Sequence, residues 1–204
     1  MQIKMHGQYE YDRDFAQRLG LEFTAAYSDK STYHGYEDVY SHLLAHRSPK
    51  SFLEIGLFLK DSQATDLFAW EKMFPNADIY GADIKSLYLF NRDRIKTFFI
   101  DQSDEKTILG LKTLLPEKID IILDDASHIY ELTIKTFENM FDLVADGGIY
   151  MIEDILYGNY NMDSYEQRAS QLIEYFDKTG LGYEIFATSK IETCVDSIVL
   201  AVFK

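Results

Sequence analysis

The chain has 204 residues, of which 47% are hydrophobic and 26% charged, and this suits one ordinary folded domain rather than a disordered segment. Its 34 acidic and 20 basic residues give a net charge of −14. A field of that sign repels phosphate backbones and anionic bilayers, so it argues against nucleic acid or a membrane as partner. The single cysteine, Cys194, excludes an internal disulfide and a cysteine-based zinc site.

The apolar runs and the N-terminal segment bear on location. No apolar stretch approaches the roughly 18 residues that a membrane-spanning helix needs. The N-terminal segment has no apolar signal region. We therefore predict a cytoplasmic protein.

The first 48 residues are polar and rich in tyrosine. We predict that they form an N-terminal helical extension (1–48) that packs on the core, with a helix over Glu37–His46. No linker, repeat or low-complexity segment follows, so residues 49–204 are predicted to form the main domain.

Beyond Pro49, short apolar runs alternate with helical patterns. The predicted strands are Ser51–Leu57, Ala77–Ala82, Ile95–Ile100, Ile119–Leu123, Gly148–Ile152, Gly182–Ala187 and Val195–Phe203. The predicted helices are Ser62–Met73, Ser103–Leu114, Tyr130–Leu143 and Ser164–Thr179. This alternation predicts an α/β fold with a doubly wound, mostly parallel, seven-stranded sheet. Because no helix separates the last two strands, one antiparallel strand is expected near the C-terminus.

Acidic side chains occur at the ends of the first five predicted strands. They are Glu54, Asp83, Asp101, the pair Asp124 and Asp125, and the pair Glu153 and Asp154. An ordinary turn explains any one of them. In doubly wound sheets, however, ligands bind outside the carboxyl ends of the strands, so acidic residues at all five ends predict a ligand site at that edge.

The loop after the first strand distinguishes between cofactors. A pyrophosphate-binding loop needs G-x-G-x-x-G, whereas here only Gly56 is present and Lys60 stands where a second glycine is expected. A dinucleotide is therefore disfavoured. Asp83 is placed to accept hydrogen bonds from ribose hydroxyls, although a plain strand-end turn explains it equally well. Asp101 is a weaker candidate for an adenine amino group.

The most specific segment is Asp124–His128. Adjacent carboxylates at the end of a buried strand are costly unless a cation or hydrogen-bond donors compensate them. With Glu153 and Asp154 nearby, the oxygen-rich set suits a hard cation such as Mg²⁺. His128 is then placed to take a proton from a hydroxyl beside that cation. The alternative is structural: a helix-capping role for Asp125 or Ser127 and a partly buried histidine.

At these residues the chain resembles the class I S-adenosylmethionine-dependent methyltransferases. More narrowly, it resembles the metal-dependent sugar O-methyltransferases of the macrocin and mycinamicin group, which includes proteins called cephalosporin hydroxylases. The matching segments are Ser28-Asp29-Lys30, His34-Gly35-Tyr36-x-x-x-Tyr40, Phe52–Gly56, Tyr80–Asp83, Asp101–Asp104, Asp124–His128 and Gly147–Asp154. The segments Asp124–His128 and Gly147–Asp154 discriminate best, since Glu-x-Gly alone is common. Two residues depart from the pattern of the group. Lys60 replaces the usual glycine of the first loop, and Ala126 replaces the usual glycine between the aspartate pair and Ser127-His128.

The resemblance implies roles for particular residues. Cofactor-binding residues are implied at Glu54, Gly56, Asp83, Asp101, Gln102 and Asp124. Metal ligands are implied at Asp125, Glu153 and Asp154, with His128 as the base and Asp125 beside it in catalysis. Residues 49–204 would then be the methyltransferase domain, with S-adenosylmethionine and Mg²⁺ as cofactors.

The implied function is transfer of a methyl group to a hydroxyl of a sugar or glycosylated small molecule, in natural-product or surface-polysaccharide biosynthesis. A saccharide or glycoside is thus the expected partner, and a homodimer is among the expectations. Two alternatives stay open. One is a hydroxylase, which needs a redox metal, although no clear two-histidine, one-carboxylate set is present. The other is a non-catalytic protein that kept the fold, for which Lys60 is the one hint.

Overall fold

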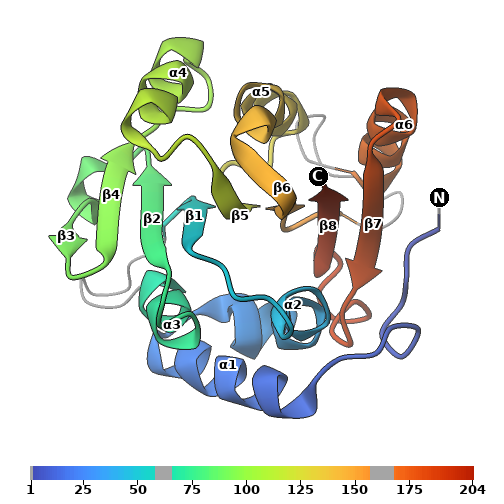
Figure 1. The fold of residues 1–204 in the computed structure, drawn as a ribbon. Coiled ribbons are helices and arrows are strands. Elements are labelled where there is room, and N and C mark those ends of the chain that lie inside the picture. The colour runs from blue at the N-terminus through green and yellow to red at the C-terminus, as the bar shows by residue number, and fades with distance from the viewer. Residues whose placement is uncertain (1, 58–65, 157–167) are drawn as a thin grey trace.

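The computed structural model describes residues 2–57, 66–156 and 168–204 (Figure 1). Its centre is one sheet with the strand order β3-β4-β2-β1-β5-β6-β8-β7. The strands are β1 (Ser51–Ile55), β2 (Asp78–Asp83), β3 (Asn91–Arg92), β4 (Ile95–Phe99), β5 (Ile119–Asp124), β6 (Val144–Ile152), β7 (Gly182–Ala187) and β8 (Ile198–Phe203). The doubly wound α/β fold predicted from the sequence is confirmed.

The C-terminal hairpin reverses one strand of the main sheet. β8 lies between β6 and β7 and runs antiparallel to both. β1, β2, β4, β5 and β6 are parallel neighbours, so their carboxyl ends meet at one edge of the sheet. The predicted antiparallel strand near the C-terminus is therefore confirmed.

The described residues hold eight strands rather than the seven predicted, because β3 adds a two-residue strand antiparallel to β4. Both of its residues are exposed, and the turn between the strands contains Asp93 with φ of 49°. Such a short polar strand has no apolar alternation, so the sequence pattern did not reveal it.

Helices cover both faces of the sheet (Figure 1). On one face lie α1 (Arg13–Ala25), α2 (Glu37–Leu44) and α3 (Asp66–Met73); on the other lie α4 (Glu105–Leu114), α5 (Tyr130–Met140) and α6 (Ala169–Thr179). Shorter turns are the π-helix η1 (Lys30–His34) and the 3₁₀ turns η2 (Ser86–Tyr88) and η3 (Phe141–Leu143). Among the described residues, no helix is both long and apolar enough to cross a bilayer.

Each face has its own apolar core, and this explains why the central strands read as continuous apolar runs. The core beneath α1–α3 is aromatic: Trp70 stacks on Phe52 at 4.6 Å and meets Phe23 edge-on at 5.1 Å. Because Phe23 belongs to α1, the N-terminal helices pack directly on the sheet core. The boundary at residue 48 stays a prediction.

Candidate active site

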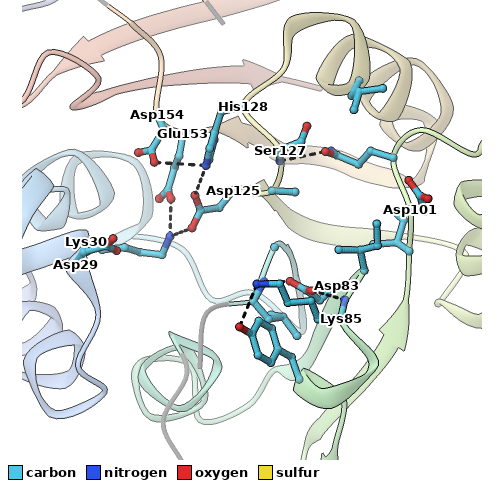
Figure 2. Close-up of a pocket in the computed structure, with 18 of the residues that line it drawn as sticks. Asp29, Lys30, Asp83, Lys85, Asp101, Asp125, Ser127, His128, Glu153 and Asp154 are labelled. Carbon is cyan, nitrogen blue, oxygen red and sulfur yellow. Dashed lines mark hydrogen bonds and ion pairs between the residues drawn. The ribbon is translucent and has the colours of Figure 1, made fainter. Parts of the chain in front are cut away.

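The carboxyl edge of the sheet holds a cavity of about 390 Å³ (Figure 2). We call it the strand-end cavity. The predicted site residues on its wall are Gly56, Asp83, Asp101, Gln102, Asp125, His128, Glu153 and Asp154. Two predicted cofactor residues, Glu54 and Asp124, are not on the wall; both are buried behind it, at 1% and 2% exposure.

Gly56 allows the loops after β1 and β5 to meet. Its φ is +95°, and a Cβ atom there would lie 2.1 Å from the backbone oxygen of Asp125. The Asp125 amide in turn donates to the Ile55 carbonyl at 2.8 Å. Only glycine fits this backbone conformation and this close approach without strain, so the loop that carries Asp125 depends on Gly56.

Asp83 organises the neighbouring loop. Its Oδ2 accepts from the Leu57 amide at 2.7 Å, and its Oδ1 accepts from the Lys85 amide at 2.6 Å. Each carboxylate oxygen keeps a second lone pair for a ligand. The strand-end turn and the ligand role proposed from the sequence are therefore compatible, since the carboxylate serves the turn and still lines the cavity.

Farther along the wall, Asp101 is held by a local turn in which its Oδ1 accepts from the amide and the hydroxyl of Ser103. These hydrogen bonds hold the pKa of Asp101 below its usual value. Gln102 instead links the wall to the interior: its Nε2 donates to both oxygens of Asp124, and its Oε1 accepts from the Ser127 amide.

Asp124 lies in the sheet interior. Burial raises its pKa to about 7, against hydrogen bonds from Tyr150 and Gln102 that lower it. In this structure Asp124 therefore positions Gln102, and through it Ser127. A direct cofactor contact by Asp124 stays a prediction.

The opposite wall is organised by Lys30, which belongs to the matching segment Ser28-Asp29-Lys30 and was not among the predicted site residues. Lys30 is 1% exposed, and its ammonium hydrogen bonds to Oδ2 of Asp125 and, at 2.5 Å, to Oε2 of Glu153 (Figure 2). Two more carboxylates, those of Glu54 and Asp66, lie 3.4 and 3.5 Å away. One cation thus faces four acidic groups.

The excess of acidic groups over basic ones in this cluster, which consists of Lys30 and its four carboxylates, shifts the pKa values of its members. Burial alone would lower the pKa of Lys30, but the four carboxylates around it, Asp125 and Glu153 foremost, together outweigh burial and hold the pKa well above its usual value. Burial raises the pKa of Glu153 to about 7, although Lys30 opposes the shift, and it also raises the pKa of Glu54. The cluster therefore favours additional cations.

His128 and Asp154 face each other across this wall. Nε2 of His128 lies 3.6 Å from Oδ2 of Asp154 and 3.9 Å from Oδ1 of Asp125. Both His128 and Asp154 have φ of 53°, a left-handed conformation that is uncommon for residues other than glycine. Backbone strain of this kind occurs preferentially at functional sites.

Tyr36 fixes the second of these residues. Its hydroxyl donates to Oδ1 of Asp154 at 2.5 Å, and the Asp154 amide donates back to the Tyr36 oxygen at 3.2 Å. Tyr36 and Tyr40 are fully buried. Tyr27 and Tyr33 are exposed, whereas Lys60, Tyr157, Tyr160 and Tyr165 lie outside the described residues.

The three predicted metal ligands do not all meet at one point. Asp154 lies beside His128, Glu153 is bonded to Lys30, and Asp125 contacts both His128 and Lys30. One ligand atom each from Asp125, His128 and Asp154 lie within 4.8 Å of one another, as a shared ion requires. Glu153 is outside that group, and its Oε2 is hydrogen bonded to Lys30, as is Oδ2 of Asp125. Asp125 directs Oδ1 at His128 and Oδ2 at Lys30. The role of the three as ligands stays a prediction.

A second cavity, of about 520 Å³, adjoins the first. The two share the residues Ser127, His128 and Asp154. The rest of the second cavity is lined by Tyr33, Ile129, Leu156 and the turn Thr193–Asp196. His128 and Asp154 therefore stand at the junction of two spaces, an arrangement suited to bringing two different ligands together.

No protein-family model matches the chain. Among curated proteins it is similar to the 8-demethyl-8-alpha-L-rhamnosyl tetracenomycin-C 2'-O-methyltransferase of Streptomyces olivaceus, with 31% identity over 63% of this chain and 35% of that protein. It is also similar to the mycinamicin VI 2''-O-methyltransferase of Micromonospora griseorubida, with 35% identity over 42% of this chain and 21% of that protein. The chain thus spans about a third of the length of the first of these relatives.

Among solved structures, the MycE methyltransferase of mycinamycin biosynthesis, in complex with Mg, SAH and mycinamycin VI, superposes with a TM-score of 0.70. The match covers 92% of this chain and 53% of MycE, at 23% identity. The chain has the class I methyltransferase fold. The resemblance to sugar O-methyltransferases noted in the sequence is confirmed by these relatives.

Proposed function

We propose that this chain is an S-adenosylmethionine-dependent O-methyltransferase that acts on a hydroxyl of a sugar or glycosylated small molecule, assisted by Mg²⁺. The observation that carries the proposal is the junction of two cavities at His128 and Asp154. These relatives are O-methyltransferases by name, and two of the names contain a rhamnosyl group, which supports the same chemistry. A cytoplasmic location and a homodimer stay predictions.

The strand-end cavity suits the cofactor. S-adenosylmethionine carries a sulfonium and an ammonium, and the cavity wall is rich in carboxylates. Gly56, Asp83 and Asp101 would bind the cofactor across the ends of β1, β2 and β4. Glu54, behind the wall, has two buried carboxylate oxygens without a hydrogen-bond partner among the described residues, which fits an additional positive charge nearby.

The donor set also suits a hard cation. Asp125, Glu153 and Asp154 offer carboxylate oxygens, the ligands that Mg²⁺ prefers. Oε1 of Glu153 is buried and has no hydrogen-bond partner among the described residues, so it is available to an ion. In this proposal Asp125 and Asp154, whose ligand atoms lie within 4.8 Å of each other, hold the ion. Glu153 is outside that group and remains bonded to Lys30 through Oε2, so its side chain has to turn Oε1 toward the ion to join them.

We assign the acceptor to the second cavity, because it reaches the strand-end cavity at His128. Its lining combines an exposed aromatic ring, Tyr33, with the carboxylate of Asp196 and apolar side chains. Aromatic faces and hydrogen-bonding carboxylates together suit a saccharide that has both apolar and hydroxylated faces.

The chain's own residues then provide the acid–base chemistry. When bound, S-adenosylmethionine would supply the methyl group and Mg²⁺ would polarise the acceptor hydroxyl. His128 takes the hydroxyl proton at Nε2, and the carboxylates of Asp154 and Asp125 stabilise the imidazolium that results. With the cofactor in one cavity and the acceptor in the other, the shared residues Ser127, His128 and Asp154 would hold the two close together, and such positioning supplies much of the rate.

Calorimetric titration with S-adenosylhomocysteine, with and without Mg²⁺, followed by a methyl-transfer assay on rhamnosylated aromatic compounds, tests the proposal. We expect cofactor binding, and transfer that is lost when EDTA removes the metal. Absence of S-adenosylhomocysteine binding would favour a non-catalytic protein. Oxidation of the acceptor without methyl transfer would favour the hydroxylase alternative.

A further inference from the structure

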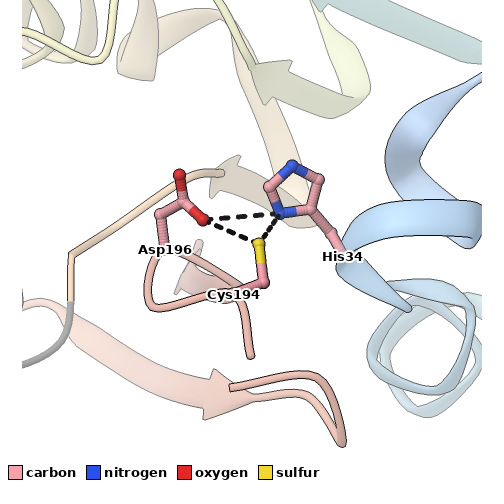
Figure 3. Close-up of side chains that lie close together, drawn as sticks. All are labelled: His34, Cys194 and Asp196. Atoms are coloured by element: carbon pink, nitrogen blue, oxygen red, sulfur yellow. Dashed lines mark hydrogen bonds and ion pairs between the residues drawn. The ribbon is translucent and has the colours of Figure 1, made fainter. Parts of the chain in front are cut away.

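A second group of ligand-type side chains lies on the wall of the second cavity, apart from the carboxylates that surround Lys30. It consists of His34 from η1 and of Cys194 and Asp196 from the turn before β8 (Figure 3). Although His34 and Cys194 are 160 positions apart, Figure 3 shows the imidazole, the thiol and the carboxylate pointing at one another. The proposed methyl transfer uses none of the three as acid, base or Mg²⁺ ligand.

The spacing of the three atoms matches a small tetrahedral metal site. Nδ1 of His34 lies 3.5 Å from Sγ of Cys194 and 3.8 Å from Oδ1 of Asp196, and Sγ lies 3.0 Å from Oδ1. Bonds of about 2.0–2.3 Å at tetrahedral angles separate neighbouring ligand atoms of Zn²⁺ by about 3.4–3.6 Å. Shifts of a few tenths of an ångström would therefore complete three corners of the tetrahedron.

The surrounding structure holds these side chains in place. His34 and Cys194 are 5% and 4% exposed, and the His34 ring stacks on Tyr36 at 5.0 Å with an interplanar angle of 5°. The His34 carbonyl accepts from the Thr188 hydroxyl, and the Cys194 amide donates to the carbonyl of Lys190. Because the ligands are preorganised, little conformational freedom is lost when an ion binds.

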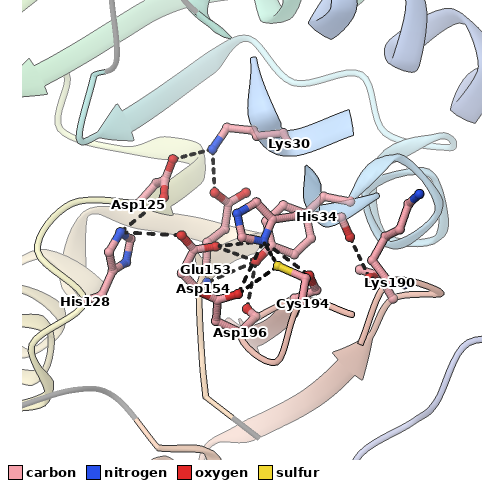
Figure 4. Close-up of polar contacts among 12 residues, drawn as sticks. Lys30, His34, Asp125, His128, Glu153, Asp154, Lys190, Cys194 and Asp196 are labelled. Carbon is pink, nitrogen blue, oxygen red and sulfur yellow. Dashed lines mark hydrogen bonds and ion pairs between the residues drawn. The ribbon is translucent and has the colours of Figure 1, made fainter. Parts of the chain in front are cut away.

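The site is also accessible. Cys194 and Asp196 line the second cavity, so an ion can enter from that side and keep one position open to water or another ligand. Figure 4 shows the group beside Asp154, whose Oδ1 lies 3.7 Å from Nδ1 of His34. An ion bound there would therefore place positive charge next to the junction of the two cavities.

We propose that His34, Cys194 and Asp196 form a binding site for a thiophilic divalent cation of the Zn²⁺ type, separate from the proposed Mg²⁺ ligands. The thiol selects the ion, because sulfur and imidazole ligands favour Zn²⁺ whereas Mg²⁺ takes oxygen ligands. On binding, the thiol proton is released to solvent and a thiolate–metal bond forms. The site shares Asp196 with the proposed acceptor cavity, but its test requires neither S-adenosylmethionine nor methyl transfer.

The exclusion of a cysteine-based zinc site, predicted from the single cysteine, is too broad. A single cysteine does exclude a site made of several cysteines, but the fold brings a histidine and an aspartate to the same point. Cys194 is buried and lies in the turn that precedes β8, where its side chain is directed at His34.

Because Cys194 is the only cysteine, its alkylation reports on the site alone. The full chain is treated with EDTA, supplied with excess Mg²⁺ to occupy the carboxylate ligands, and reacted with iodoacetamide at increasing Zn²⁺. We expect Zn²⁺ to slow alkylation by at least about 10-fold. We also expect Co²⁺ to give a thiolate-to-metal charge-transfer band at one ion per chain. An unchanged alkylation rate, or Co²⁺ binding without that band, would overturn the proposal.

Two variants separate a ligand set from a mere hydrogen-bond network. Asp196→Asn keeps the thiol as the reporter and removes one ligand, so the Zn²⁺ concentration needed for protection should rise at least about 10-fold. Glu192→Gln removes the same charge from an exposed position in the same turn and should leave protection unchanged. Equal shifts in both variants would indicate a general charge effect and contradict the assignment.

Discussion

Nζ of Lys30 lies 2.5 Å from Oε2 of Glu153, although the two residues are 123 positions apart in the chain. Lys30 starts the π-helix η1, and Glu153 directly follows β6. Their contact ties the N-terminal segment to the acidic edge of the sheet. It also allows Glu54 and Asp125 to be buried near one another, since the same ammonium lies within 4 Å of both.

Replacement of Lys30 by methionine should destabilise the fold strongly. The change leaves Asp125 and Glu153 without their shared donor, and breaking a buried ion pair costs about 3–5 kcal/mol. The measurement is the free energy of unfolding in urea. Lys72→Met, which removes an ammonium from the exposed pair with Glu22, is the matched control and should cost less than about 1 kcal/mol. Similar losses in both variants would mean that Lys30 has no special role.

Substitution of His128 by alanine should reduce methyl transfer by about 10²–10⁴-fold, the usual contribution of a general base. S-adenosylhomocysteine affinity should stay nearly unchanged, because His128 lies on the acceptor side of the strand-end cavity. Turnover and calorimetric affinity are measured together, with the exposed His46→Ala as control. Normal turnover in His128→Ala would remove this residue from the mechanism.

A methyl group at Gly56 should disrupt the cofactor loop. The Cβ of Gly56→Ala would meet the Asp125 carbonyl oxygen at 2.1 Å, so the backbone of one loop has to move. We expect a lower melting temperature and weaker S-adenosylhomocysteine binding. Gly110→Ala in α4 is the control: nothing lies within 4 Å of its added Cβ, and alanine should stabilise that helix. Retained affinity in Gly56→Ala would show that the loops separate easily.

Glu37 should make stability depend on pH. Burial raises its pKa above the ordinary 4.5, so between the two values the native state holds a proton that the unfolded chain has lost. The free energy of unfolding therefore falls as pH rises through this interval. Glu37→Gln should unfold at a higher temperature than the unmodified chain at mildly alkaline pH, with the difference shrinking toward acidic pH.

The control for this change is Glu105→Gln, an exposed glutamate that, like Glu37, lies in the first turn of a helix. Thermal unfolding of both variants is followed across the same pH range. A pH-independent offset in Glu37→Gln, parallel to that of Glu105→Gln, would rule out titration of Glu37 as the cause.

The sequence allowed prediction of the features that follow from local periodicity. Ile119–Leu123 is apolar except for Asp120 and is followed by the carboxylate of Asp124, and its place between two helical patterns predicts a buried parallel strand. Parallel strands share one carboxyl edge, so the gathering of Asp83, Asp125 and Asp154 at a single cavity could be anticipated from topology alone.

Pairings across long stretches of chain could not be predicted in this way. Lys30 precedes Asp125 by 95 positions and lies in a polar segment that no strand or heptad pattern marks. The available signal was the excess of carboxylates at the strand ends, whose compensation was assigned to Mg²⁺, although a buried basic side chain from elsewhere in the chain compensates such groups as well. Because Lys30 was not predicted at the site, the sequence also did not show that the side chain of Glu153 points toward it.

The insertion of β8 between β6 and β7 constrains the order in which the molecule can be assembled. Apart from a bridge to Lys4, β7 pairs within the described sheet only with β8, which the ribosome makes later. The turn that carries Cys194 and Asp196 lies between these two strands. During synthesis the strands around the cofactor-side cavity are therefore complete first, and the wall of the second cavity takes its final form only when Ile198–Phe203 has emerged and docked.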